Sequence, residues 1–169
     1  MKKGFYKYLL GVLILLIFDQ SIKYYVFHNL PKMNWLHPFY PFGGIGVFKD
    51  FFGITFSINY LANTGAAWGT FSSYGKFLFF LRIMIVLFLI VYLFHFNKAK
   101  RRNFPLFLII SGAIGNILDY VLYGHVVDMF NFNFWGYSYP VFNIADSYIT
   151  IGVIWLLLIS LFPIDKKVV

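Results

Sequence analysis

Residues 77–96 read FLFFLRIMIVLFLIVYLFHF, an apolar run in which Arg82 is the one residue with a full charge. An α-helix of about 20 mostly apolar residues is long enough to cross the hydrocarbon core of a bilayer. On either side of this run, three further stretches have the same length and character: residues 8–27, 104–123 and 142–162. The sequence therefore predicts four transmembrane helices.

The composition also indicates a protein that lies in lipid. Of the 169 residues, 60% are hydrophobic and 12% are charged, and the mean hydropathy is +0.74. So few charges do not coat a water-soluble globule of this size. We expect one α-helical integral membrane domain, residues 1–169. The first run begins with basic residues, as a secretory signal does, but no small-residue cleavage site follows it, which predicts a retained helix.

The net charge of +8 is concentrated where the chain enters and leaves the predicted membrane region. Nine of the fourteen lysines and arginines lie in the N-terminus, in residues 97–103 and in the C-terminus. Because cytoplasmic flanks are enriched in basic residues, both termini are expected in the cytoplasm and residues 28–76 outside it. These positions favour anionic lipid headgroups over nucleic acid as partners. Lys23 and Arg82 are expected to snorkel to the outer interface.

The extracytoplasmic segment 28–76 is too long for a bare loop. Within it, residues 51–60 are rich in β-branched and aromatic side chains and partly alternate, which predicts a strand. This strand is expected to pair with residues 45–48 across a turn at Lys49 and Asp50, as a small sheet on the outer membrane surface. Residues 124–141 are expected to form a loop whose dense aromatics belong to the interfacial belt.

Four aspartates fall at one depth of the predicted bundle. Asp19, Asp119 and Asp146 lie in the outer half of predicted helices, and Asp128 follows one of them. A charged side chain at the bilayer centre costs about 2.5–3.5 kcal/mol on insertion scales, so these carboxylates need a reason. Asp128 and Asp146 flank one loop, and two adjacent carboxylates can share a proton and do acid and base work together. Catalysis, helix packing and ion or proton transport all remain compatible with this spacing.

Further polar and small residues accompany the aspartates. Asp19 and Lys23 are spaced to form an ion pair on one helix face. Residues 63–69, NTGAAWG, suit either an ordinary turn or the close approach of a peptide backbone. Residues 112–116, GAIGN, form a small-residue helix face, in which Asn116 is assigned to packing more readily than to a hydrogen bond across helices or toward substrate. The chain has no cysteine and its four histidines lack metal-ligand spacing, so no metal site is expected.

In their order and spacing, these segments resemble the lipoprotein signal peptidase (signal peptidase II) family. The matching segments are Asp19 with Lys23, NTGAAWG from residue 63, GAIGNILD from residue 112, GHVVD ending at Asp128, and FNIADS at residues 142–147. The resemblance implies that Asp128 and Asp146 form a catalytic dyad. It also implies a set of residues that shape or support the site: Asp19, Lys23, Asn63, Gly65, Gly112, Asn116, Asp119 and Asn143.

The resemblance further implies a substrate and a location. The expected activity is that of an aspartic endopeptidase of the bacterial cytoplasmic (inner) membrane, which uses no cofactor and cleaves diacylglyceryl-modified prolipoproteins just before the lipidated cysteine. Its site is expected near the outer face, beneath an outer sheet and a short amphipathic helix. The alternative is a small proton-coupled or ion-transporting membrane protein. The sequence departs from the family at Tyr120, where an arginine usually follows the motif aspartate, and a phenol does not replace its several donors.

Overall fold

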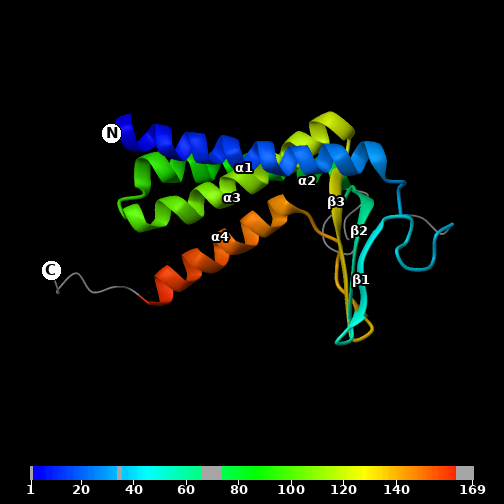
Figure 1. Ribbon diagram of the computed structural model, residues 1–169. Helices are drawn as coiled ribbons and strands as arrows, with labels where there is room; N and C mark the ends of the chain where they lie inside the picture. The colour runs from blue at the N-terminus through cyan, green and yellow to red at the C-terminus, as the bar shows by residue number, and fades with distance from the viewer. Residues whose placement is uncertain (1, 34–35, 66–73, 163–169) are drawn as a thin grey trace.

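The computed structural model describes residues 2–33, 36–65 and 74–162, with side chains from Tyr6 onward. Within these residues, four helices are long and apolar enough to cross a membrane. The helices are α1 (Lys2–Asn29), α2 (Gly75–Val91, continued by a π-helical turn, Tyr92–Phe96), α3 (Asn103–Tyr123, preceded by a 3₁₀ turn, Lys100–Arg102) and α4 (Ile144–Leu161). The four predicted transmembrane helices are confirmed. The start of α1 and the end of α4 lie at one end of the bundle, and a sheet lies across the other end (Figure 1).

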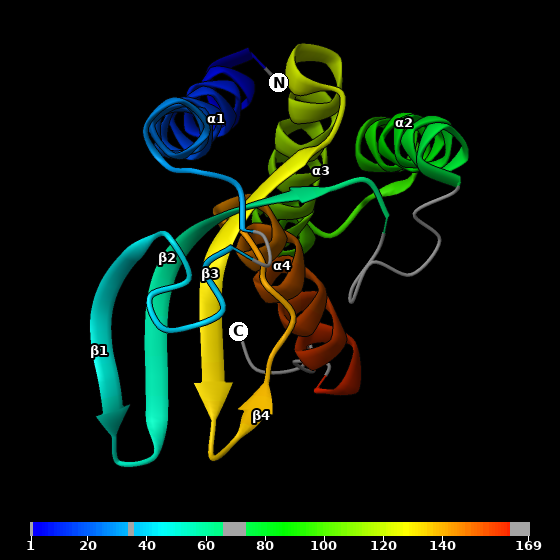
Figure 2. The same cartoon turned by 90° about the vertical axis from the view of Figure 1, so that its right-hand side faces the viewer.

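The sheet is antiparallel, with its strands in the order β1-β2-β3-β4. Its strands are β1 (Ile45–Phe51), β2 (Ile54–Asn63), β3 (Val126–Phe134) and β4 (Tyr137–Ser138). β3 leaves the end of α3 and pairs with β2, so two segments far apart in the chain lie side by side (Figure 2). The expected small sheet is confirmed, and it is larger than the sequence analysis predicted.

Two expectations about this sheet are wrong in detail. The first hairpin reverses at Phe52 and Gly53 and not at Lys49 and Asp50, because Phe52 and Gly53 both have positive φ, 52° and 78°, as a two-residue hairpin turn requires. Asp50 instead lies within β1, where the pairing register shifts. Residues 124–141, expected as a loop, contain β3 and β4.

The short amphipathic helix is not among the elements between α1 and α2 in the described residues. The gaps at residues 34–35 and 66–73 interrupt this part of the chain, and the second gap contains Ala66–Gly69 of the NTGAAWG segment. The expectation for those residues therefore lies outside the structure described.

Buried residues of α1, β2 and β3 attach the sheet to the helices. Val26, Tyr60, Val127 and Met129 form one apolar cluster, each no more than 3% exposed. Successive side chains of a strand point to opposite faces. Because Val127 and Met129 both pack into this cluster, Asp128 between them points to the other face of β3, toward the helix ends.

α3 lies at the centre of the bundle and contacts α4 closely. A Cβ atom on Gly112 would collide with the carbonyl oxygen of Ala145, and one on Gly152 would lie 2.6 Å from Ile109 Cγ1. Glycine at these positions lets the two backbones approach, as small residues do in membrane helix pairs. Many outward side chains of α2 and α4 are apolar; Phe88, for example, is 68% exposed in the isolated chain, as expected of a lipid-facing residue.

Candidate active site

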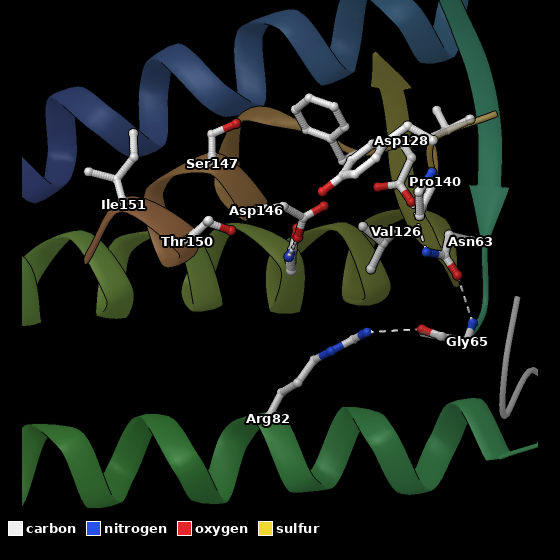
Figure 3. Close-up of a pocket in the computed structure, with 14 residues that line it drawn as sticks. Asn63, Gly65, Arg82, Val126, Asp128, Pro140, Asp146, Ser147, Thr150 and Ile151 are labelled. Atoms are coloured by element: carbon white, nitrogen blue, oxygen red, sulfur yellow. Dashed lines mark hydrogen bonds between the residues drawn. The ribbon is translucent and has the colours of Figure 1, made fainter. Parts of the chain in front are cut away.

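A cavity of about 620 Å³ lies where the sheet meets the helices. This volume is in the range of small-molecule and peptide-binding clefts. The lining residues come from β2 and the turn after it, α2, α3, β3, the β4–α4 connection and α4: Asn63, Gly65, Arg82, Asn116, Val126, Asp128, Tyr139, Pro140, Val141, Phe142, Asp146, Ser147, Thr150 and Ile151. Figure 3 shows the carboxyl groups of Asp128 and Asp146 turned toward the same space.

Asp128 is 1% exposed and accepts two amide hydrogen bonds. Asn63 Nδ2 donates to its Oδ2 at 2.8 Å, and Asn143 Nδ2 donates to its Oδ1 at 2.7 Å. Burial, together with the nearby Asp146 carboxylate, raises the pKa of Asp128 to about 7, and the two amide donors oppose that rise. This carboxyl group therefore exchanges its proton near neutral pH.

Asp146 is the third residue of α4 and takes part in a reciprocal cap. The Asp146 backbone N–H donates to Asn143 Oδ1 at 2.9 Å, while the Asn143 backbone N–H donates to Asp146 Oδ2 at 3.2 Å. A capping box of this kind satisfies two N–H groups at the helix start. The other carboxylate oxygen, Oδ1, accepts from Asn116 Nδ2 at 2.8 Å. Both carboxylate oxygens are thus oriented by asparagines.

Asn143 links the two carboxyl groups directly. Its side-chain Nδ2 bonds Asp128, while its side-chain Oδ1 and backbone N–H both bond Asp146. Asn143 is completely buried, so the protein shields its amide from bulk solvent. One asparagine therefore sets the relative placement of Asp128 and Asp146.

A fully buried charged cluster lies behind the cavity. Lys23 Nζ is 2.9 Å from Asp19 Oδ2 and 2.7 Å from Asp119 Oδ2, and all three side chains are at most 1% exposed. The expected Asp19–Lys23 ion pair is confirmed. The expectation that Lys23 snorkels to the interface is wrong, because two carboxylates and the Asn116 Oδ1, 3.0 Å away, hold its ammonium group inside the bundle.

The carboxylates of this cluster also hold the backbone beside each cavity aspartate. Asp19 Oδ1 accepts from the N–H of Ala145 at 2.9 Å, and Asp119 Oδ2 accepts from the N–H of Val127 at 3.2 Å. Ala145 and Val127 immediately precede Asp146 and Asp128. The cluster therefore joins α1 and α3 to the two segments that present the cavity carboxylates.

Comparison with known proteins identifies the family of this chain. Residues 11–162 match the family described as Signal peptidase (SPase) II. The chain belongs to the signal peptidase II family. A lipoprotein signal peptidase of Staphylococcus aureus is 38% identical over 95% of this chain and 94% of its own, and one of Clostridium acetobutylicum is 34% identical over 94% and 96%. A solved structure of a bacterial membrane enzyme is 31% identical, covers 100% of this chain and 96% of its own, and has a TM-score of 0.78.

Membership of the signal peptidase II family makes this chain a bacterial membrane protease that removes signal peptides from lipoproteins. The structure brings the sequence-predicted site residues of this signal peptidase into two connected groups. Asp128, Asp146, Asn63, Gly65 and Asn116 line the cavity. Asn143, Asp19, Lys23, Asp119 and Gly112 lie behind it, and Gly112 provides room for the start of α4.

The packing interpretation of Asn116 is too narrow. Its amide accepts from Lys23 on one side and donates to Asp146 on the other, so it connects α1, α3 and α4 through hydrogen bonds. A hydrogen bond across helices was the alternative that the sequence left open, and its partners could not be named because each comes from another helix. Tyr120, where the family usually has arginine, stacks on Phe79 of α2 with ring centroids 4.8 Å apart, and so points away from this network.

Sequence reasoning missed two residues of the candidate site. Gln20 Nε2 donates to Asp119 Oδ1 at 2.8 Å and to Asp19 Oδ2 at 3.1 Å. Both carboxylates of the charged cluster therefore accept a hydrogen bond from Gln20 in addition to their ion pair with Lys23. Arg82 lines the cavity and donates to the carbonyl oxygen of Gly65, a role beyond the snorkelling that the sequence predicts for it. A signal for Arg82 was present, since a lone cation in a membrane helix usually faces the protein interior.

No group of three or more histidine or aspartate side chains in the described part of the chain is arranged to hold a metal ion. Near the cavity, the described acidic side chains are instead bonded to amides or to Lys23. Buried carboxyl groups held in this way can take up and release protons.

Proposed function

We propose that this signal peptidase II is an aspartic endopeptidase in which Asp128 and Asp146 are the catalytic residues. Its proposed substrates are diacylglyceryl-modified prolipoproteins, cleaved just before the lipidated cysteine. The observation that carries the proposal is the pair of buried carboxyl groups that face one cavity and are joined through Asn143.

The proposed reaction divides the acid and base work between the two carboxyl groups. Below about pH 7 Asp128 holds a proton, so it can donate to the carbonyl oxygen of the scissile amide. Asp146 accepts a proton from a water molecule as the water oxygen attacks the carbonyl carbon. A tetrahedral diol results. When the C–N bond breaks, the leaving nitrogen takes the proton from Asp146, and a diol hydroxyl returns a proton to Asp128.

The cavity position supports a lipid-anchored substrate. It lies at the sheet end of four membrane-length helices, and Val141, Phe142 and Ile151 give part of its wall an apolar character. A precursor that is held in the bilayer by two acyl chains presents its nearby peptide bond at the depth of the membrane boundary. The basic residues at the opposite end of the helices support cytoplasmic termini and a site near the outer face.

The test is a gel-shift assay of a lipidated precursor with the wild type and with Asp128→Asn and Asp146→Asn. Each variant is expected to insert normally and to lose processing, because an amide neither accepts nor donates the proton that the reaction moves. Asp50→Asn is the matched control, since Asp50 is an exposed aspartate of β1. Wild-type processing by either cavity variant would reject the dyad. Equal cleavage of lipidated and unlipidated precursors would reject the substrate assignment.

A further inference from the structure

Arg82 is a cation within a membrane-length helix. It lies seven residues beyond the first residue of α2, about 10 Å along the helix axis at a rise of about 1.5 Å per residue. The side chain is half-buried and lines the cavity that contains Asp128 and Asp146. Figure 3 shows it extending from α2 across the cavity toward Gly65. Because burying a charge in a membrane protein is unfavourable, its contact partner is the best guide to its role.

The contact partner of Arg82 begins a chain of hydrogen bonds that ends on Asp128. Arg82 Nη2 donates to the Gly65 carbonyl oxygen at 3.1 Å, and the Gly65 N–H donates to Asn63 Oδ1 at 2.9 Å. Asn63 Nδ2 then donates to Asp128 Oδ2 at 2.8 Å. Each link uses a different donor and acceptor, so the three bonds form together without competition.

The link through Gly65 determines which end of the Asn63 amide faces Asp128. An asparagine side chain has one acceptor end and one donor end. Because the Gly65 N–H occupies the Oδ1 end, the Nδ2 end is left to point at Asp128. If Gly65 moved away, the Asn63 amide would lose the contact that orients it. Arg82 fixes Gly65 from the opposite side, from a helix whose Val86 belongs to the same apolar cluster as Ile110 of α3.

We propose that Arg82 is a positioning residue for the reaction, acting through Gly65 and Asn63 to hold the amide donor on Asp128. This inference rests on the proposed function of Asp128. Arg82 bridges α2 and the end of β2 and thereby keeps the Asp128 carboxyl oriented toward Asp146. Its guanidinium acts through the protein backbone and does not contact the scissile amide.

The experiment measures kcat and KM for a lipidated precursor with full-length Arg82→Met and Arg82→Lys. Arg82→Met removes the donor and is expected to lower kcat about tenfold, the effect of losing roughly one oriented hydrogen bond, with little change in KM. Arg82→Lys keeps a donor for the Gly65 carbonyl and is expected to recover most of the lost kcat. Lys76→Met, which removes an exposed cation of the same helix, is the matched control and is expected to keep wild-type kinetics.

A double-mutant cycle with Asn63→Ala tests the path of the effect. If Arg82 acts through Asn63, adding Arg82→Met to Asn63→Ala lowers kcat by less than about twofold, because the link is already broken. Multiplicative losses would overturn the proposal, as would a raised KM at unchanged kcat, which would indicate direct substrate binding. Failure of lysine to restore kcat in a normally folded variant would also overturn it. Loss of processing in Asp128→Asn together with full activity in Arg82→Met would reject this inference alone, whereas an active Asp128→Asn would reject the proposed function.

Discussion

The buried charged cluster should make Lys23→Met strongly destabilising. The Lys23 ammonium lies 2.9 Å from Asp19 and 2.7 Å from Asp119, with no more than 1% of any of the three side chains exposed. Methionine fills similar space but leaves two carboxylates buried without a cation. Breaking a buried ion pair from one side costs about 3–5 kcal/mol, mainly because the remaining charge has no compensation. We expect a loss of this size in the free energy of unfolding.

The assay is reversible unfolding of the purified protein in detergent micelles, followed by the fluorescence of its four tryptophans. Lys7→Met is the matched control, because Lys7 is an exposed lysine of the same helix, and it should change stability by no more than about 0.5 kcal/mol. A second variant removes all three charges together, as Asp19→Asn, Lys23→Met and Asp119→Asn. It should regain much of the lost stability, because asparagine oxygens still accept from the Ala145 and Val127 N–H groups.

The pair of variants separates charge from packing. If the triple variant is as unstable as Lys23→Met, the loss comes from side-chain shape and not from uncompensated charge. If Lys23→Met unfolds at the same denaturant concentration as Lys7→Met, the Lys23 ammonium does not stabilise the buried carboxylates of Asp19 and Asp119. Either result would refute the reasoning.

Two further predictions concern the dyad and the α3–α4 contact. Burial raises the pKa of Asp128 to about 7, so the proton it donates is present below that pH and lost above it. The kcat/KM of the wild type should fall above about pH 7, by about tenfold per pH unit, with an apparent pKa that belongs to the pair; a flat profile from pH 6 to pH 9 would contradict this. Gly112→Ala places a methyl group against the Ala145 carbonyl and 2.8 Å from Ile149 Cγ1. The free energy of unfolding, measured by thermal unfolding, should therefore fall by about 1–3 kcal/mol. Processing should also weaken, because Asp146 moves with Ala145. Gly11→Ala is the control, because nothing lies within 4 Å of the new methyl group, and its free energy of unfolding should rise by up to about 1 kcal/mol. Equal effects at both glycines would contradict the close contact of Gly112 with Ala145.

Much of the helical part of the fold could be predicted from the sequence, because bilayer thickness sets the length of an apolar run. The sheet was harder to predict from the sequence. In β3, Phe130, Phe132 and Phe134 alternate with asparagines, which is the pattern of a half-buried strand. Aromatics that directly follow a membrane helix, however, equally indicate an interfacial belt. Their pairing partner, β2, lies about 70 residues earlier in the chain, and no local pattern indicates so distant a contact.

Some features of the candidate site could likewise be predicted from the sequence, and others could not. The closeness of Asp128 and Asp146 follows from two neighbouring antiparallel segments and could be predicted from their positions. The link through Asn143 could not, because it depends on a helix N-cap that reaches back to a strand. Gln20 contributes through a contact with another helix, and Arg82 through a contact with the turn after β2. The face that each side chain presents is decided by packing and not by its neighbours in sequence.

Asparagine amides lie between the cations of the site and the carboxyl groups of Asp128 and Asp146. This placement explains how the carboxyl pair keeps a proton that can be exchanged. An ammonium in direct contact with the dyad would favour its ionised form and remove the proton that the reaction needs. Lys23 is instead separated from Asp146 by Asn116, which accepts from Lys23 at 3.0 Å and donates to Asp146 at 2.8 Å. The Asn116 amide thus orients the Asp146 carboxylate, while the Lys23 ammonium stays out of direct contact with it. Asn63 likewise stands between Asp128 and the Gly65 carbonyl to which Arg82 is bonded. Both cations of the site are therefore joined to the carboxyl groups by hydrogen bonds that pass through an asparagine. The pKa of Asp128 stays raised, because burial and the Asp146 carboxylate outweigh the amide donors and the charge of Lys23.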